Sequence, residues 1–174
     1  MGQQIILTIV ASDRPGLVDV LSSAVEAHGG NWLASSMARL GGEFAGIVEV
    51  DVPEAQRQAF EAALAGLSAQ GIEVSVRSES QPQGGQAGGH AAHLMLSGVD
   101  HPGIVHNVSH VLAEHGVSID ELHTRVFMGS MSGEALFEAQ AEMVLPDGFD
   151  AGSLHEALEA IAGDLLVEIS LKVD

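Results

Sequence analysis

The sequence predicts an α+β protein made of two βαββαβ units, each with a four-stranded antiparallel sheet. Residues 13–18 (DRPGLV) recur as residues 100–105 (DHPGIV), 87 positions later, and both copies show the same order of strand and helix patterns. A stretch rich in Gly and Gln separates them. We therefore expect a first domain at 1–79, a linker at 80–91 and a second domain at 92–174.

The first strand and helix of copy one follow from periodicity. The β-rich run 4–10 predicts a strand that ends in the turn residues 12–16. Pro15 suits the first turn of a helix, where its missing N–H costs nothing. A three- and four-residue spacing then predicts one apolar helix face, and Gly29-Gly30 ends that helix. The residues of this face are Leu17, Leu21, Ala24, Val25 and His28.

The second half of copy one predicts a hairpin, a helix and a last strand. Residues 32–40 and 44–52 read as strands around Gly41-Gly42, which is a hairpin signal. Pro53 opens a second helix, Gly71 ends it, and the alternating run 72–76 completes the sheet.

Copy two repeats this order with a longer, Gly/Ser-rich hairpin tip at 128–133. We expect strands near 93–98, 118–127, 136–145 and 166–173, and helices near 103–114 and 151–162. A unit with this order closes as an antiparallel sheet covered on one face, which is the ferredoxin-like arrangement. Its open sheet face and strand edges favour pairing with another domain or chain.

Charge limits the choice of partners. Six Lys/Arg against 24 Asp/Glu give a net charge of −18, with about −6 in the first copy and −12 in the second. Such a surface repels phosphate backbones and anionic membranes, so we expect neither nucleic acid nor membrane as a direct partner. The absence of a signal-peptide pattern and of a long apolar run predicts a cytoplasmic protein.

Cysteine and histidine usage argue against a resident metal or cofactor. The chain has no Cys, which excludes disulfides, Cys-ligated metals and thiol catalysis. His106 and His110 lie one helical turn apart, but no Glu follows His106 as in a zinc-protease motif. They stand opposite the apolar stripe of their helix, so we expect them to face water and predict no metal site and no cofactor.

The two strand–turn–helix junctions are the strongest candidates for ligand binding. A helix N-terminus offers backbone N–H groups to a carboxylate, and Gly16 and Gly103 let a ligand approach the backbone. Asp13 and Asp100 stand beside them, where they can accept hydrogen bonds from an ammonium group. The alternative is that both Asp residues only cap their helices.

The repeated D-x-P-G-L/I-V turn, followed by G-G-N-W at 29–32 or G-V-S-I at 116–119, resembles the ACT domain, a small-molecule-binding regulatory module. The resemblance implies a site between two domains, with the turn of one facing the start of the second strand of the other. Asn31 then stands at the amide position of copy one, and its side chain can both donate and accept. Ser118 replaces it in copy two, which leaves ligand binding by that copy in doubt.

The resemblance thus implies a set of ligand-binding residues, with Asp13 of one domain and Asn31 of its pairing partner at the centre. Arg14 could attract a ligand carboxylate, and His101 could do so only when protonated, although both residues also suit a solvated turn. The full set is Asp13, Arg14, Pro15, Gly16, Leu17, Asn31, Asp100, His101, Gly103, Ile104 and Ser118.

The resemblance implies a non-enzymatic regulatory protein that senses glycine or a similar small amino acid. It would form a homodimer and act through protein–protein contact, for example on a transcriptional activator in the regulation of amino-acid metabolism. One alternative is an interaction module whose ligand pocket is vestigial. Another is a small enzyme or metalloprotein built on the histidine-rich second copy.

Overall fold

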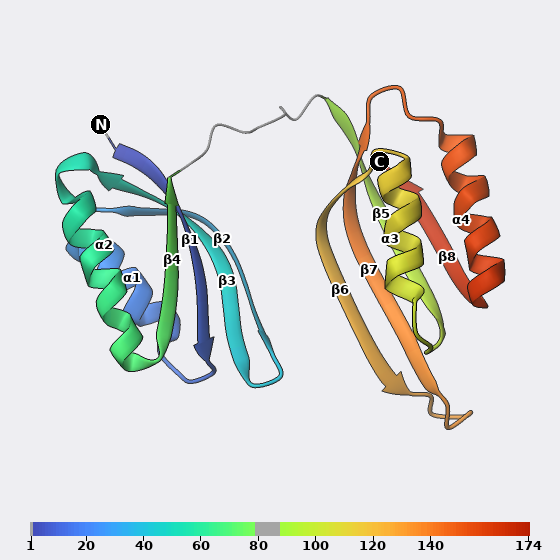
Figure 1. Ribbon diagram of the computed structural model, residues 1–174, viewed down its shortest axis with the longest axis horizontal. Helices are drawn as coiled ribbons and strands as arrows, with labels where there is room; N and C mark the ends of the chain where they lie inside the picture. The colour runs from blue at the N-terminus through green and yellow to red at the C-terminus, as the bar shows by residue number, and fades with distance from the viewer. Residues whose placement is uncertain (1, 79–87) are drawn as a thin grey trace. The chain divides into compact units, whose positions relative to one another are not determined.

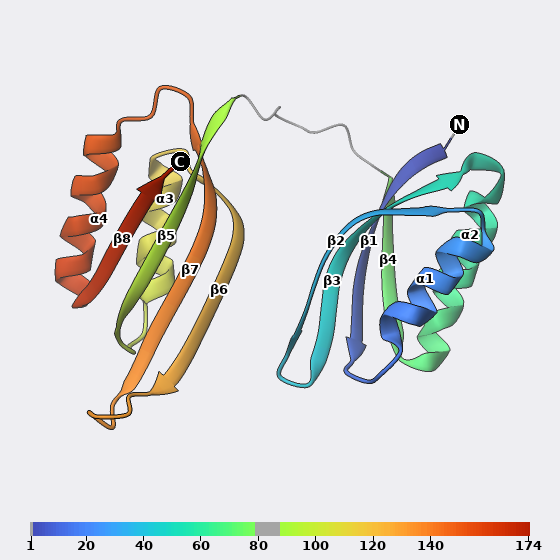
Figure 2. The same cartoon turned by 180° about the vertical axis from the view of Figure 1, so that it is seen from behind.

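The computed structural model describes residues 2–78 and 88–174. It divides into two compact units, Met1–Gln83 and Gly84–Asp174. Each unit runs strand, helix, strand, strand, helix, strand, and both of its helices cover the same face of its sheet (Figures 1 and 2). The predicted α+β class and the repeated βαββαβ order are confirmed.

The elements of the first unit lie close to the predicted ranges. They are β1 (Gly2–Ser12), α1 (Leu17–Ala27), β2 (Asn31–Leu40), β3 (Glu43–Pro53), α2 (Arg57–Gly66) and β4 (Ile72–Ser78). Short 3-10 turns, Glu54–Gln56 and Leu67–Gln70, precede and follow α2.

The second unit repeats these elements. They are β5 (Gly89–Val99), α3 (Ile104–Glu114), β6 (Ser118–Met128), β7 (Ala135–Pro146), α4 (Ala151–Leu165) and β8 (Val167–Val173). Asp150 caps α4, because its Oδ1 accepts a hydrogen bond from the Ser153 N–H at 3.1 Å.

Both sheets are antiparallel and have the same topology. The strand orders are β2-β3-β1-β4 and β6-β7-β5-β8, so β2 and β6 each lie at an edge and pair on one side only. Each pairing has one register shift near its start, between Trp32 and Ala34 in β2 and between Ile119 and Glu121 in β6. The sheets therefore match the predicted ferredoxin-like arrangement.

Strand alternation builds a separate core in each unit. Ile5, Leu7 and Ile9 point toward the helices and are at most 1% exposed, whereas Thr8 and Val10 lie on the open face of the sheet. Phe60 and Leu64 of α2 close the first core. In the second unit Leu94 and Leu96 of β5 pack in the same way against α3 and α4.

Several boundaries differ from the sequence expectation. Helix α1 begins after the Pro-Gly pair and not at the proline, because Gly16 adopts a left-handed φ of 89°. Pro53 is the last residue of β3 and does not open α2, which begins at Arg57 after a 3-10 turn. Strand β5 begins at Gly89, inside the range predicted as linker, because Gly89 and His90 pair with the end of β7. The rest of the predicted linker, apart from residue 88, lies outside the described residues.

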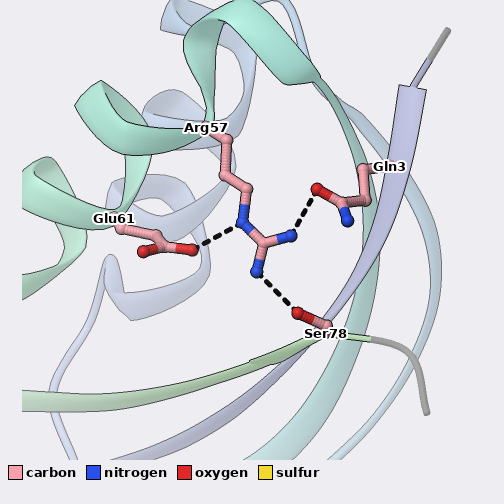
Figure 3. Close-up of polar contacts among 4 residues, drawn as sticks. All are labelled: Gln3, Arg57, Glu61 and Ser78. Carbon is pink, nitrogen blue, oxygen red and sulfur yellow. Dashed lines mark hydrogen bonds and ion pairs between the residues drawn. The ribbon is translucent and has the colours of Figure 1, made fainter.

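A polar cluster joins α2 to the ends of two strands in the first unit (Figure 3). Arg57 Nε donates to Glu61 Oε1 at 2.8 Å, and Nη2 donates to Ser78 Oγ at 2.8 Å. Its Nη1 donates to Gln3 Oε1. The guanidinium thus ties the first turn of α2 to the start of β1 and the end of β4, which its several donors in a fixed plane suit.

Candidate ligand-binding turns

The turn between β1 and α1 presents unsatisfied backbone donors. The first hydrogen bond of α1 runs from the Val20 N–H to the Gly16 oxygen at 3.0 Å, and no side chain caps the helix. The N–H groups of residues 17–19 are therefore available to an acceptor from outside the chain. Apart from its two chain neighbours, no residue has a heavy atom within 4 Å of the position that a Cβ on Gly16 would occupy.

The carboxylate beside this turn is already engaged. Arg39 Nη1 on β2 donates to Asp13 Oδ2 at 3.0 Å, and the Asp13 side chain is 29% exposed. The sequence did not predict this ion pair, because the two residues are 26 positions apart. Asp13 therefore already accepts a charged donor from its own unit, which weakens its expected role as the acceptor for a ligand ammonium.

The equivalent turn of the second unit lacks this ion pair. Val126 on β6 pairs with Phe137 as Arg39 on β2 pairs with Phe44, so an uncharged side chain takes the place of the arginine. The backbone anchor is the same in both turns: the Asp13 N–H donates to the Gly42 oxygen and the Asp100 N–H to the Ala135 oxygen, each at 2.8 Å.

The start of α3 combines uncapped N–H groups with an amide side chain, since Asn107 Nδ2 lies 3.2 Å from the position that a Cβ on Gly103 would occupy. Its first hydrogen bond runs from the Asn107 N–H to the Gly103 oxygen at 3.0 Å, so the N–H groups of residues 104–106 precede the first intrahelical bond. Asn107 Nδ2 also donates to the Gly103 oxygen at 2.7 Å. The sequence analysis missed Asn107, because the repeat has Val20 at that position and offered no polar residue for comparison.

His101 contacts backbone at both ring nitrogens. Nε2 lies 2.7 Å from the Leu165 oxygen at the end of α4, and Nδ1 lies 3.0 Å from the Pro102 oxygen. The hydrogen bond to Leu165, then that to Pro102, raises the pKa of His101 above its usual value of 6.5, and the nearby Asp100 carboxylate adds to the effect. The ring therefore fastens the turn to α4 and is not turned toward a ligand.

The remaining predicted residues fall into two groups. Arg14 and Pro15 lie exposed in the first turn. Leu17 and Ile104 are 4% and 3% exposed and belong to the cores, so only their backbone N–H groups are available at the turns.

Asn31 and Ser118 lie at the far end of their own units. Asn31 pairs with Asp51, which pairs with Gln4, nine residues before Asp13 along β1. Nine residues of strand span about 30 Å, and Ser118 is separated from Asp100 in the same way through Val144 and Ala91. Within one unit, therefore, the turn and the start of the second strand do not form one site.

Asp51 is a second residue that the sequence analysis missed. Its Oδ1 is buried and, among the described residues, has no hydrogen-bond partner. It lies opposite Asn31 in the register, whereas Val144 faces Ser118 in the second unit. The only signal was the pair of acidic residues at alternate strand positions, Glu49 and Asp51, and such a pair does not differ from that of a solvated strand face.

The histidines of α3 lie on its exposed side, as predicted. The rings of His106 and His110 stack with centroids 6.2 Å apart. In the part of the chain that the structure describes, no group of three His, Asp or Glu side chains is arranged to hold a metal ion. In that same part, no helix combines the length and apolar character that crossing a membrane requires.

Comparison with known proteins identifies the first unit. Residues 3–77 match the family model of the ACT domain. The first unit is an ACT domain. The second unit repeats its element order and sheet topology, so the chain has the architecture of a tandem ACT protein, as the repeated turn predicted.

Two solved structures share the two-unit fold of this chain. An unknown protein from Galdieria sulphuraria is 29% identical, with a TM-score of 0.84 over 100% of this chain and 99% of its own. A "putative glycine cleavage system transcriptional repressor" is 20% identical, with a TM-score of 0.70 over 100% of this chain and 98% of its own. No curated protein matches the chain.

Proposed function

We propose that the chain is a non-enzymatic regulatory protein of the cytoplasm that binds glycine or a similar small amino acid. The observation that carries this proposal is the β5–α3 turn, where the first N–H groups of α3 have no side-chain cap and Asp100 stands three residues before Gly103. A zwitterionic ligand needs both features: the N–H groups and the positive end of the helix dipole hold its carboxylate, and Asp100 holds its ammonium.

This assignment reverses the order of the two sites expected from sequence. The first turn has the same backbone donors, but Oδ2 of Asp13 already accepts a hydrogen bond from Arg39. A ligand ammonium would compete with a guanidinium there, whereas at Asp100 the equivalent strand position is Val126. We therefore assign the stronger site to the second turn.

The output that we propose is contact with another protein. The similar structure named as a glycine cleavage system repressor supports a role in transcription, but a net charge of −18 disfavours direct binding to DNA. The partner would then be a transcriptional activator with a basic surface, which the second unit, at about −12, would attract.

Titration calorimetry of the full chain with glycine, serine and alanine tests ligand binding. Asp100→Ala should weaken binding by about tenfold or more, because a charge-assisted hydrogen bond is lost. The matched variant Asp13→Ala should change the affinity by less than about threefold. An absence of heat with every amino acid at millimolar concentration would contradict the proposal.

A second candidate function is an interaction module with a vestigial pocket. The Arg39–Asp13 ion pair favours it, since the protein's own side chain occupies the first expected ammonium site. In that case no amino acid would raise the melting temperature, because only a ligand that binds the folded state stabilises it. A thermal shift screen of the twenty amino acids separates the two functions.

A further inference from the structure

The helix side of strand β6 is left bare by the other elements of the second unit. Leu122 pairs with Ala141 of β7, and Ala141 is part of the core. Val126 pairs in the same way with the core residue Phe137. Both β6 side chains therefore point to the face that carries the helices, yet Leu122 is 46% and Val126 54% exposed. Helix α3 lies between α4 and β6 (Figures 1 and 2), so the layer of helices ends before it covers this strand.

An apolar groove separates α3 from β6. Strands β5 and β7 contribute its floor, Ile119 and Leu122 of β6 form one wall, and α3 forms the other from Ile104 to Leu112. Apart from Ser109, all of its lining residues are apolar. The α3 wall is about 12 Å long, or just over two turns of helix. The groove is therefore long enough for a regular element of a partner and has no charge of its own to oppose it.

The equivalent positions of the first unit are filled or polar. Trp32 stands where Ile119 stands in the register, and its ring packs against the first core. Ser35 stands at the position of Leu122. The apolar groove is thus a feature of the second unit, and the exchange of Trp32 for the smaller Ile119 contributes to opening it.

The charge of the second unit indicates what the groove can accept. From residue 92 onward, 14 Asp/Glu stand against two Lys/Arg, so a second copy of this unit would bring the same excess of negative charge. Glu114 and Asp120 are exposed and lie within two residues of the groove residues Leu112 and Ile119. A partner that combines apolar with basic residues therefore matches the groove better than another copy does. A helix with one apolar face flanked by Lys and Arg has this composition.

We propose that the groove between α3 and β6 binds a basic amphipathic helix of a partner protein. A helix of about three turns, packed beside α3 at the usual axial separation of about 8–10 Å, would cover the bare face of β6. Its apolar residues would contact Ile119, Leu122 and Val126, and its Lys and Arg would face Glu114 and Asp120. This inference deepens the proposed function and rests on it, since it takes the second unit as the part that contacts a protein partner.

Fluorescence anisotropy of the full chain with a labelled peptide tests the groove. The probe is a peptide of about 14 residues of Leu and Lys, with Leu at three- and four-residue spacing so that one helix face is apolar. A peptide of the same composition with its Leu scattered around the helix is the control. The native chain should bind the amphipathic peptide at least about tenfold more tightly than the scattered one. Equal affinity for both peptides would show charge attraction alone and would overturn the proposal.

Two substitutions locate the binding and separate apolar contact from charge. The carboxylate of Leu122→Asp would by itself attract a basic peptide, so a loss of affinity of at least about tenfold has to come from the lost apolar contact. Ser35→Asp adds the same charge at the equivalent position of the first unit and should change the affinity by less than about twofold. Ile119→Trp fills the groove as Trp32 does in the first unit and should weaken binding at least about threefold. Unchanged affinity in either groove variant, with circular dichroism showing a folded chain, would place the peptide elsewhere and contradict the proposal.

Sedimentation velocity without peptide tests a second copy as the occupant. Native chain and Leu122→Asp should sediment alike, whereas a native dimer that Leu122→Asp dissociates would assign the groove to a second copy and overturn the proposal. Calorimetry with glycine on the same samples separates this inference from the proposed function. Peptide binding without amino-acid binding would refute the proposed sensing and leave the groove in place, and amino-acid binding without peptide binding would refute the groove alone.

Discussion

Both ring nitrogens of His101 face carbonyl oxygens, and a carbonyl oxygen can only accept a hydrogen bond. A neutral imidazole has one N–H and satisfies one of the two oxygens, whereas the imidazolium donates to Leu165 and Pro102 together. The protonated ring also places a positive charge at the C-terminus of α4, where the helix dipole favours a cation. The folded state therefore binds the proton on His101 more tightly than the unfolded state does.

The stability that His101 contributes should decrease as pH rises. Because its pKa is raised in the folded state, the contribution is fully present below the unfolded pKa of about 6.5 and disappears as pH rises through the folded pKa. The melting temperature of native protein minus that of His101→Gln should therefore be larger at pH 5.5 than at about pH 8.5. His106→Gln, on the exposed side of α3, is the control, and a difference independent of pH would refute the assignment.

For individual residues of the candidate site, the sequence predicted those of the two turns but not their long-range partners. The Asp, Pro and Gly residues of the two turns were identified because neighbouring residues alone create a helix start. The Arg39–Asp13 pair was not, because it depends on the length and register of the hairpin that carries Arg39 across to the turn. Asp51 was missed for a related reason: a strand pattern shows on which face a carboxylate lies, but not whether neighbours bury it.

At the scale of elements, local signals predicted most boundaries. Strand alternation and the glycine stops after α1 and α3 act within a few residues, and the observed ends agree with them closely. The end of α4 is different. Leu166 adopts a left-handed φ of 55°, the only non-glycine residue with positive φ in the described chain. The sequence therefore predicted the helix to end at 162, whereas it continues to Leu165.

Replacement of Leu166 by glycine should stabilise the second unit. Leu166 is 82% exposed, so its side chain contributes little burial, and a left-handed conformation costs a non-glycine residue about 1–2 kcal/mol. The flexibility of glycine in the unfolded chain offsets part of this gain, which leaves about 0.5–1 kcal/mol. Urea unfolding followed by circular dichroism measures the change.

Gly71, with a φ of 76° before β4, provides the reciprocal test in the first unit. Gly71→Ala should lower the free energy of unfolding by about 1 kcal/mol. The added Cβ would meet no neighbouring side chain or backbone within 4 Å, so backbone strain is the only cost of the substitution. A loss of stability in Leu166→Gly would show that Leu166 makes contacts that outweigh its strain.

At the scale of the whole molecule, the described residues form two hydrophobic cores, and each core draws its residues from one unit. The first centres on β1, β3 and Phe60, and the second on β5, β7 and Leu158. The repeat in the sequence predicted this duplication, because two copies of one amphipathic pattern each contain a complete set of core positions. The differences between the two turns were not predictable in the same way. They depend on single exchanges, such as Val126 in the second unit at the position of Arg39 in the first.

Separate cores predict separate unfolding. Phe60 is fully buried, so Phe60→Ala should lower the stability of the first unit by about 3–5 kcal/mol and leave the second unit unchanged. Trp32 is the single tryptophan and packs against the first core, so its fluorescence reports on the first unit alone. Hydrogen exchange of peptides from β5 and β7 follows the second unit in the same sample.

Leu158→Ala, at 2% exposure, is the reciprocal variant. It should leave the Trp32 transition in place while exchange in β5 and β7 accelerates. If Phe60→Ala instead moved both transitions together, the two cores would form one cooperative unit, and a ligand bound at one turn would then stabilise the entire chain.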